Sequence, residues 1–460
     1  MTTTTDQERP ARAGTTTGAP PRSGPVLTAL AAGFVMAALD STVITAVGAT
    51  IQRGLRASLS QLTWIVDGYV LAFAALLLLA GGLANRFGPR PVYLAGLVLF
   101  WLASAGAAAA PDGTALVAAR LAQGAGAALF MPASLSLLVH AFPEPARRAR
   151  MLALWSAIVS TAAGIGPTVG GLLAGAFGWR AVFLINLPVG LAGLLLTRRC
   201  VPAPAGGGSR PPVAGHGLLV AALAGLAYTL IEGPRLGWGA APVLAAYAVV
   251  VLGAGGLAVR ERRGRGAAVL PWTLFRRRAF TAANVIGFLF NFALYGTLFV
   301  LGLYLQQERG ASPLAAGLEM LPASGLWVVG NLVYGRAAGR VPARVLLAAS
   351  LAGAALGAAA LAAVRPGTPY LLVLPAIVLA NAGAGIVSPA MTAVLVDAAG
   401  REHANTSGAV LNANRQVGQL VGIAVAGAVL GASGLPPAFL LIAGAYAVAA
   451  AAAWTLLGKR

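Results

Sequence analysis

Long apolar runs, separated by short polar segments, dominate the pattern of hydrophobic and polar positions along this chain. Most of them approach or exceed the roughly 18–20 apolar residues that a helix needs to cross the hydrocarbon core of a membrane. Glycine, proline and arginine mark the breaks between runs, as expected for turns between helices. The pattern predicts fourteen spanning helices, at 25–47, 60–82, 92–110, 113–139, 149–173, 179–197, 215–233, 241–259, 279–305, 313–335, 343–364, 370–396, 405–431 and 436–457.

The composition supports the same fold class. The 460 residues are 58% hydrophobic and only 10% charged, whereas a soluble domain carries about 25% charged residues and needs them to cover its surface. The 60 glycines suit the close approach of helices in lipid. We therefore expect an all-α polytopic membrane protein. The single cysteine, Cys200, excludes a disulfide framework and a cysteine-based metal site.

The net charge of +20 comes from short basic clusters between the apolar runs. This distribution indicates membrane topology, and we expect no nucleic-acid partner. If the N-terminus is inside, the inner segments hold roughly four times as many basic residues as the outer ones, in line with the positive-inside rule. We therefore predict a multi-pass protein of the plasma (inner) membrane with both termini in the cytoplasm. Residues 1–24 lack an apolar signal-peptide core and are predicted to be a disordered cytoplasmic tail.

One loop pattern occurs twice, after the second and after the tenth predicted span. The residues that repeat at identical spacing are Gly81, Ala84, Arg86 and Arg90 in the first copy, and Gly335, Ala338, Arg340 and Arg344 in the second. Two six-helix halves with two helices between them explain this repeat. We predict an N-terminal six-helix bundle at 25–197, two linker helices with cytoplasmic loops at 198–278, and a C-terminal six-helix bundle at 279–460.

Five short segments resemble the major facilitator superfamily, specifically its fourteen-helix drug:proton antiporter branch. They occur in the family's order, at 39–43, 81–90, 116–128, 164–171 and 179–190. The resemblance implies a monomeric transporter that works by alternating access in the lipid bilayer and uses the proton gradient in place of a cofactor. Where the family usually has an aspartate in the loop between helices 2 and 3, this chain has Asn85, which can cap a helix end but brings no charge.

Asp40 is the one carboxylate in the middle of the first apolar run. Ionisable residues inside a membrane are rare and mark ion or proton pathways by default. Burial disfavours the charged form of a carboxylate, so such a group can take up and release protons. The resemblance places the first and fourth helices in one half, which would bring Arg120 close to Asp40. The alternative is a structural pair of Asp40 with Arg120 or with the hydroxyls of Ser41 and Thr42.

Other ionisable residues inside the spans leave alternatives open. We expect Asp67 either to line the outer part of a cleft or to reach the membrane interface. Glu319 is a second candidate for proton or cation contact, or an interfacial residue. Glu232 is expected at the interface. Arg120 cannot lose its proton, so it either tunes a neighbouring carboxylate or serves as a scaffold, and Arg415 is either its mirror in the second half or a buried anchor.

Two sets of residues are candidates for conformational change. The repeated loop would close an inner gate on helix-end carbonyls, or only anchor the chain by its positive charge; this set is Gly81, Asn85, Arg86, Gly88, Arg90, Arg340 and Arg344. The second set would give a smooth, kinked surface on which two halves rock, or only tight packing; it is Gly164, Gly166, Pro167, Gly170 and Gly171. For the substrate cavity we predict Trp64, Gln123, Asn291, Tyr295 and Asn381 as lining residues.

The predicted function is proton-coupled efflux of small hydrophobic or cationic organic molecules, such as drugs or antibiotics. One alternative is a symporter or facilitator of an endogenous solute. Another is a membrane-embedded lipid-handling enzyme, for which the sequence offers no convergent nucleophile and base. The chain has no Walker-type phosphate loop, so ATP drive is not expected, and its three histidines suggest no metal centre.

Overall fold

The helices of this protein are described by a computed structural model for residues 23–204, 206–208, 212–264, 272–365, 367–400 and 404–457. Their bounds in the first part of the chain are α1 (Ser23–Leu55), α2 (Leu59–Phe87), α3 (Pro89–Ala109), α4 (Gly113–Ala141), α5 (Pro145–Phe177), α6 (Ala181–Leu184), α7 (Asn186–Cys200), α8 (Val213–Leu236) and α9 (Ala241–Arg262). The second part holds α10 (Trp272–Phe275), α11 (Arg278–Leu303), the π-helical η1 (Tyr304–Glu308), α12 (Pro313–Glu319), α13 (Leu321–Ala337), α14 (Ala343–Ala362), α15 (Tyr370–Ala382), α16 (Ala384–Ala399), α17 (Ala404–Ser433) and α18 (Leu435–Leu456).

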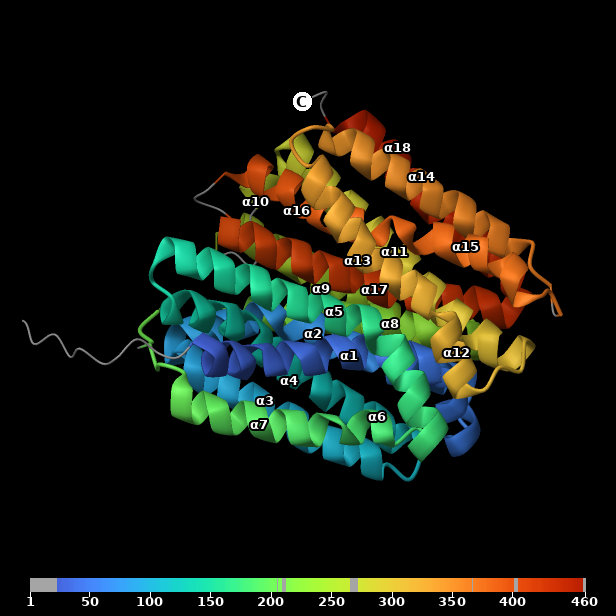
Figure 1. The fold of residues 1–460 in the computed structure, drawn as a ribbon, viewed down its shortest axis with the longest axis horizontal. Coiled ribbons are helices and arrows are strands. Elements are labelled where there is room, and N and C mark those ends of the chain that lie inside the picture. The colour runs from blue at the N-terminus through green and yellow to red at the C-terminus, as the bar shows by residue number, and fades with distance from the viewer. Residues whose placement is uncertain are drawn as a thin grey trace, which may run out of the picture.

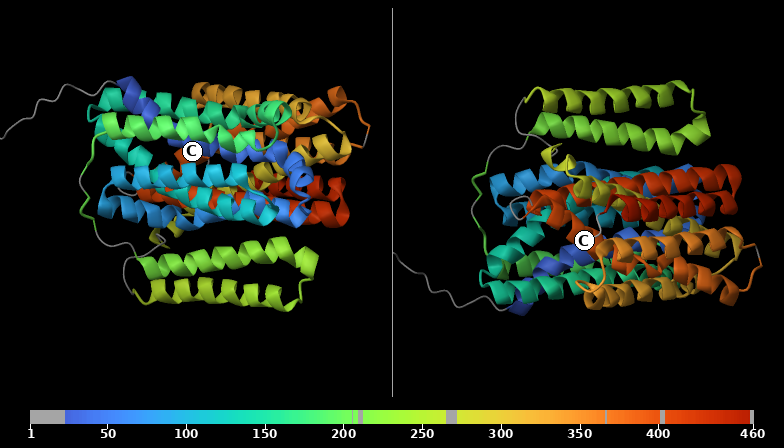
Figure 2. Two further views of the ribbon diagram at one scale, coloured as in Figure 1. Left: turned by 90° about the horizontal axis from the view of Figure 1, so that it is seen from below. Right: turned by 90° about the horizontal axis from the view of Figure 1, so that it is seen from above.

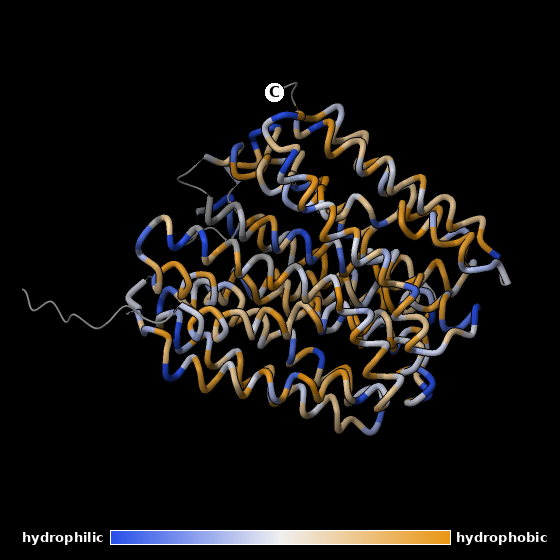
Figure 3. Tube along the Cα trace, viewed as in Figure 1, coloured by the Kyte–Doolittle hydropathy of each residue, from blue (hydrophilic) through white to orange (hydrophobic). Residues whose placement is uncertain are grey.

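The predicted membrane fold is confirmed. Within the described residues, thirteen helices are long and apolar enough to cross a membrane, and a shorter apolar stretch, Thr161–Phe177, lies within α5. Together they correspond one by one to the fourteen predicted spans. No strand occurs in the described part of the chain. Figure 3 shows hydrophobic residues along most of each helix and hydrophilic ones gathered near the helix ends. The predicted tail at 1–24 lies almost entirely outside the described residues.

Two of the predicted spans are interrupted just before a proline, where the apolar sequence pattern is continuous. The predicted helix at 179–197 is broken at Ile185 into α6 and α7, and the one at 313–335 is broken at Met320 into α12 and α13. In each case a proline, Pro188 or Pro322, follows the break by two or three residues. A proline has no main-chain N–H, so the hydrogen bond to the residue four positions earlier is missing and the helix breaks.

Polar residues start several helices. Ser58 forms a capping box with Gln61 at the start of α2, and Asp112 accepts a hydrogen bond of 2.9 Å from the main-chain nitrogen of Ala115 in α4. These side chains satisfy main-chain N–H groups that have no partner inside the helix. The tight turn between α2 and α3 requires Gly88, whose φ is 90°, a conformation that other residues rarely adopt.

The helices form two bundles that lie side by side. In Figure 1, α1 to α7 fill the lower part of the molecule, and α11 to α18 lie mostly above them. Helices α8 and α9 pack against each other, and α8 also packs against α2 and α17. Figure 2 shows this pair beside the main body of the protein. We call α1 to α7 the first bundle and α11 to α18 the second bundle; the exact domain boundaries at 25–197, 198–278 and 279–460 stay a prediction.

Described hydrogen bonds join the two bundles toward one end only. We call the end of the molecule at which α1 begins and α18 ends the terminal end. The hydrogen bonds between the bundles lie toward the other end, which we call the opposite end. Gln306 of η1 accepts a hydrogen bond of 3.0 Å from Thr50 and donates one to the carbonyl of Ala46 in α1. Nearby, the side chain of Thr168 in α5 donates to the carbonyl of Gly317 in α12 at 3.0 Å. The two bundles are therefore closed against each other at the opposite end.

Candidate functional site

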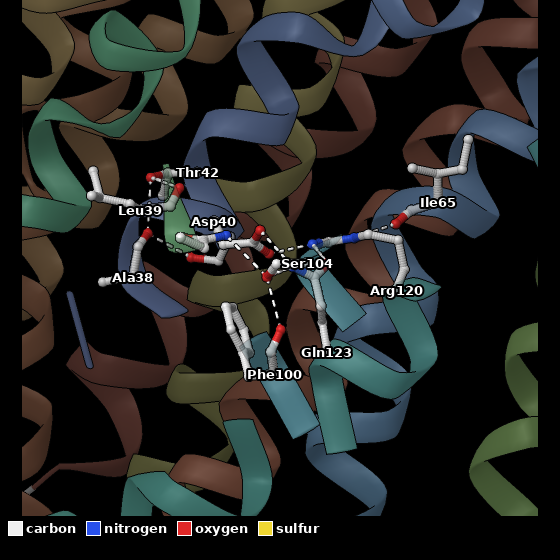
Figure 4. Close-up of polar contacts among 11 residues, drawn as sticks. Ala38, Leu39, Asp40, Thr42, Ile65, Phe100, Ser104, Arg120 and Gln123 are labelled. Atoms are coloured by element: carbon white, nitrogen blue, oxygen red, sulfur yellow. Dashed lines mark hydrogen bonds and ion pairs between the residues drawn. The ribbon is translucent and has the colours of Figure 1, made fainter. Parts of the chain in front are cut away.

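An enclosed ion pair joins α1 to α4 inside the first bundle (Figure 4). The Nη1 atom of Arg120 contacts the Oδ2 atom of Asp40, and the Arg120 and Asp40 side chains are 0% and 2% exposed. Gln123, one turn further along α4, accepts a hydrogen bond of 2.9 Å from Arg120 Nη1 and donates one of 3.3 Å to Asp40 Oδ1. The structure therefore brings Arg120 into contact with Asp40, a contact that both the coupling role and the structural role of Asp40 allow.

Further helices hold this pair in place. Arg120 Nε donates to the carbonyl of Ile65 in α2 at 2.9 Å. Gln123 also donates to the hydroxyl of Ser104 in α3 at 2.9 Å, and Asn186 of α7 approaches the same hydroxyl at 3.4 Å. A buried charge is tolerated when it is paired and its remaining hydrogen-bonding groups are satisfied. The ion pair is the centre of a polar network in an otherwise apolar bundle.

Glycines in α4 allow this network to form. A Cβ atom on Gly124 would collide with the main-chain oxygen of Tyr69 in α2, and one on Gly126 would lie 2.8 Å from the main-chain nitrogen of Phe100 in α3. Because these positions have no side chain, α4 lies close to α2 and α3. The close packing brings Arg120 within hydrogen-bonding distance of the α2 backbone.

A cavity of about 220 Å³ lies between the two bundles. Its lining includes residues of α1, α2, α4 and α5 from the first bundle and of α11, α13, α16 and α17 from the second. Most of the polar lining side chains come from the second bundle: Tyr295, Asn331, Ser388, Arg415, Gln416 and Gln419. A concave site with an apolar wall and a few polar groups is typical of small-molecule binding.

Tyr69 connects the cavity to the ion pair. Its ring lines the cavity, and the guanidinium carbon of Arg120 lies 4.6 Å from the centre of the same ring. This distance fits a cation–π interaction. Asp40 itself is not among the lining residues, although Ala37, Ala38 and Ser41 of the same helix are. One aromatic ring therefore separates the charged network from the space where a ligand can bind.

Only one of the five predicted lining residues, Tyr295, lines this cavity. Gln123 belongs to the ion-pair network, and Trp64 donates its indole hydrogen to Glu232 of α8 at 2.8 Å. Asn291 and Asn381 are buried and donate to carbonyls one turn earlier in their own helices, at 2.8 and 2.9 Å. Their amide donors are thus satisfied within the helix.

Most of the polar wall of the cavity was not predicted from the sequence. The sequence allowed two roles for Arg415, neither of them in the cavity wall. Four further lining residues were not predicted: Asn331, Ser388, Gln416 and Gln419. One signal was present in the sequence, because Arg415, Gln416 and Gln419 share one side of an apolar helix. Residues one and four positions apart lie on neighbouring faces of a helix, so a polar face of α17 was detectable.

The other predicted coupling residues lie away from the cavity. Asp67 is fully buried, which excludes the interfacial position that the sequence left open. Neither of its carboxylate oxygens has a hydrogen-bond partner among the described residues. Glu319 lies at the end of α12 and pairs with Arg309 at 3.7 Å. Glu232, four residues before the end of α8, is buried beside the exposed Arg235 and accepts hydrogen bonds of 2.8 Å from Ser60 and Trp64, which fasten α8 to α2. Its place at the membrane interface stays a prediction.

The repeated arginines lie at the terminal end and contact their own bundle. Arg90 donates to the carbonyl of Arg198 at 2.6 Å, at the end of α7. Its counterpart Arg344 lies 4.7 Å from the ring of Trp454, near the end of α18. Both therefore contact the last helix of their own bundle. Arg86 lies over the ring of Phe87.

Arg340 and Asn85 also belong to the predicted gate, and their hydrogen bonds involve main-chain atoms. Arg340 donates to the carbonyl of Arg336, four residues earlier. The main-chain oxygen of Asn85 accepts hydrogen bonds from the nitrogens of Gly207 and Gly208 at 3.3 and 3.0 Å. The Asn85 side chain is exposed and makes no hydrogen bond to a described residue. It therefore does not act as the helix cap that the sequence suggested.

The glycines of α5 face two different partners. A Cβ atom on Gly166 would collide with Thr42, and one on Gly170 would lie 2.8 Å from Val43, both in α1. A Cβ atom on Gly171 would collide with the backbone of α12 in the second bundle, whereas one on Gly164 would lie 3.4 Å from the nearest atom. Helix α5 therefore lies in close contact with both α1 and α12, and a Cβ atom on Gly317 of α12 would lie 2.9 Å from the main-chain oxygen of Pro167.

Fold and cavity together define a polytopic helical membrane protein with a ligand-sized space between two bundles. The family model of the Major Facilitator Superfamily matches residues 29–423, and the chain belongs to this superfamily. Its members are transporters, and this protein is a transporter rather than an enzyme.

Three relatives of this chain are named as resistance or export proteins. The Methylenomycin A resistance protein of Streptomyces coelicolor is 54% identical over 442 residues, which cover 95% of this chain and 93% of the relative. The protein of the same name from Bacillus subtilis is 44% identical over 94% of both chains. The Tetracenomycin C resistance and export protein of Streptomyces glaucescens is 35% identical over 89% of this chain and 76% of its own.

Proposed function

We propose that this protein exports a small organic molecule of the antibiotic kind in exchange for protons, by alternating access between its two bundles. The observation that carries the proposal is the position of Tyr69, which lines the cavity and stacks on Arg120 of the enclosed ion pair. A ligand in the cavity and a proton on Asp40 would therefore act on neighbouring groups. The names of the relatives, which confer resistance to antibiotics or export them, support both the cargo and the direction.

The coupling step follows from the chemistry of the pair. Protonation of Asp40 removes the negative charge opposite Arg120, which keeps its own positive charge. An uncompensated buried cation is costly, so the protonated form favours a conformation in which Arg120 finds another partner or water. The free-energy difference between the two conformations is not the same for the protonated and the ionised form of Asp40. Proton binding therefore shifts the balance between the conformations. Asp67 and Glu319 remain further candidates for proton binding.

The conformational step would use the contact between α5 and the second bundle. The small residues at this contact allow the backbones to slide or tilt without interlocking side chains. The repeated arginines at the terminal end, including Arg90 and Arg344, would exchange their present contacts for contacts across the bundles when that end closes. From the charge asymmetry we assign the terminal end to the cytoplasm and the protein to the plasma membrane. We further propose that it works as a monomer.

The test uses inverted membrane vesicles that contain the protein and an acidic lumen. We expect methylenomycin A, added outside, to be taken up and to dissipate part of the proton gradient, as a pH-sensitive dye reports. An ionophore that collapses the gradient should abolish the uptake. Vesicles without the protein give the background. Uptake of the antibiotic that continues after the gradient has collapsed would contradict proton antiport.

A further inference from the structure

The cavity between the bundles has two chemically different walls. The wall from the first bundle is mainly apolar and includes Ala37, Phe73 and Met131. The wall from the second bundle contains one charged residue, Arg415, between the polar residues Ser388 and Gln419. A molecule that fits both walls has an apolar body and a polar group at one end.

Arg415 has no counterion among the described residues. Its Nη2 atom donates one hydrogen bond, to the hydroxyl of Ser388 at 3.1 Å, and no ion pair in the described part of the chain includes it. Arg120, the buried arginine of the first bundle, is neutralised by Asp40. An arginine cannot lose its proton, so the positive charge of Arg415 faces the cavity without compensation.

The cavity contains no carboxylate that could neutralise this charge. The chain has 12 acidic residues, and none of those in the described part is among the lining residues. Asp40 is the acidic residue closest to the lining in sequence, but its side chain is enclosed by the pair with Arg120. Because an unpaired charge in a low-dielectric space is costly, a bound anion would stabilise this site.

Neighbouring side chains offer further hydrogen-bond donors. The amides of Gln416 and Gln419 make no hydrogen bond to a described residue, and both line the cavity beside Arg415. The planar guanidinium presents two parallel N–H groups that match the two oxygens of a carboxylate. The cavity of about 220 Å³ is smaller than the roughly 300–1,000 Å³ of sites for drug-sized ligands.

We propose that Arg415 binds the carboxylate of the transported molecule, and that the substrates are small amphipathic organic acids. This inference rests on the proposed export function and narrows its cargo. The acid group would contact Arg415 and the glutamine amides, while the apolar body would lie against the wall of the first bundle. This substrate class differs in charge from the small hydrophobic or cationic molecules that the sequence predicts.

Three probes of nearly equal shape test which ligand charge the cavity prefers. They are naphthalene-2-carboxylate, naphthalene-2-carboxamide and naphthalen-2-ylmethylammonium. Their affinities for the purified protein in lipid nanodiscs are measured by calorimetry at pH 7.5. We expect the carboxylate to bind about tenfold or more tightly than the amide and the ammonium, because hydrogen bonds to charged groups are the stronger ones. An amide or ammonium probe that binds as tightly as the carboxylate would overturn the proposal.

Variants of Arg415 distinguish the effect of its charge on ligand binding from the effect of its packing. We expect Arg415→Gln to weaken carboxylate binding about ten- to a hundredfold and to leave amide binding nearly unchanged, with Arg415→Lys in between. The matched control is Arg336→Gln, which removes an exposed arginine of α13 outside the cavity and should not change binding. If Arg415→Gln does not fold, carboxylate binding by Arg415→Lys and the preference of the unaltered protein among the three probes test the proposal. Unchanged carboxylate binding in a folded Arg415→Gln variant would also overturn the proposal.

Equilibrium binding and gradient-driven transport separate this proposal from the function on which it rests. Selective carboxylate binding without gradient-dependent uptake in vesicles would contradict the proposed antiport but support the assignment of Arg415. Gradient-dependent uptake of neutral or cationic compounds, with no preference for acids, would support antiport and overturn the assignment.

Discussion

Asp40 of α1 and Arg120 of α4 form an ion pair from which solvent is excluded. Such a pair contributes little net stability, but removal of one partner leaves an unpaired buried charge. Asp40→Asn removes the charge and the titratable proton, and keeps an oxygen that can accept from Arg120. We therefore expect this variant to be expressed and folded, with a free energy of unfolding lower by up to about 3 kcal/mol, and to lose gradient-driven transport. Vesicle uptake and thermal unfolding measure the two effects.

Asp112→Asn provides the matched control for this prediction. Asp112 is exposed and caps α4 through a hydrogen bond to the main-chain nitrogen of Ala115. Asparagine is an equally good cap, so the same chemical change should leave both stability and transport at their original level. The assignment of Asp40 to proton coupling would be wrong if Asp40→Asn transported as well as this control.

Asp67 of α2 is buried, and neither oxygen of its carboxylate has a hydrogen-bond partner in the described part of the chain. A buried polar group without a partner costs about 1–3 kcal/mol, and a protein retains such a group when its function requires it. Asp67→Leu keeps the branched shape and the number of side-chain heavy atoms, and has no polar atoms. We expect it to raise the thermal stability and to reduce gradient-driven transport.

The control for Asp67 is a second buried group without a partner. The hydroxyl of Thr229 in α8 also has no hydrogen-bond partner among the described residues, and Thr229→Val removes it with little change of shape. This variant should raise stability as well, but leave transport unchanged. A rise in stability without loss of transport in Asp67→Leu would show that Asp67 is not part of the proton pathway.

The sequence alone predicted most of this fold because length and hydrophobicity suffice to define a membrane helix. The breaks at Ile185 and Met320 were not predicted, because the apolar pattern continues through them and only the prolines that follow mark them. The contact between Asp40 and Arg120 was foreseen as an alternative, since the resemblance placed their helices in the same half.

The cavity lining was harder to predict, because it depends on which face of each helix meets the space between the bundles. Asn291 and Asn381 are polar residues in apolar spans, as cavity residues often are. Each instead donates to a carbonyl of its own helix, which satisfies the amide donor without a cavity. Tyr69 was missed for the complementary reason, since an aromatic residue in a span is usually part of the apolar core and here contacts both Arg120 and the cavity.

Gly171 of α5 lies against the backbone of α12 at Pro313 and Gly317, so a Cβ atom there has no space. Gly171→Ala should separate the bundles at the opposite end and disfavour the conformation closed at that end. Gly164→Ala is the control from the same segment, because its added Cβ would lie 3.4 Å from the nearest atom. Spin labels on Phe177→Cys and Leu371→Cys, both in strongly exposed positions at the opposite end, report the distance between bundles in a Cys200→Ser background.

We expect the distribution of spin–spin distances to shift to longer values in Gly171→Ala and to remain unchanged in Gly164→Ala. If both variants kept the original distribution, the close contact between α5 and α12 would not control the closure of this end.

Gln306 makes two side-chain hydrogen bonds between the bundles, to Thr50 and to the carbonyl of Ala46. The side chain is buried, so water does not replace these bonds when they are lost. Gln306→Leu keeps a side chain of similar bulk, and we expect it to destabilise the closed opposite end by about 1–3 kcal/mol, which is a change of about 5- to 150-fold in the balance between conformations. Gln307→Leu is the matched control, because Gln307 is exposed and its bond of 2.8 Å to Gln52 competes with water. The same spin-label pair should show a larger population with the opposite end open in Gln306→Leu than in Gln307→Leu. Equal populations in the two variants would mean that the buried contact does not hold this end closed.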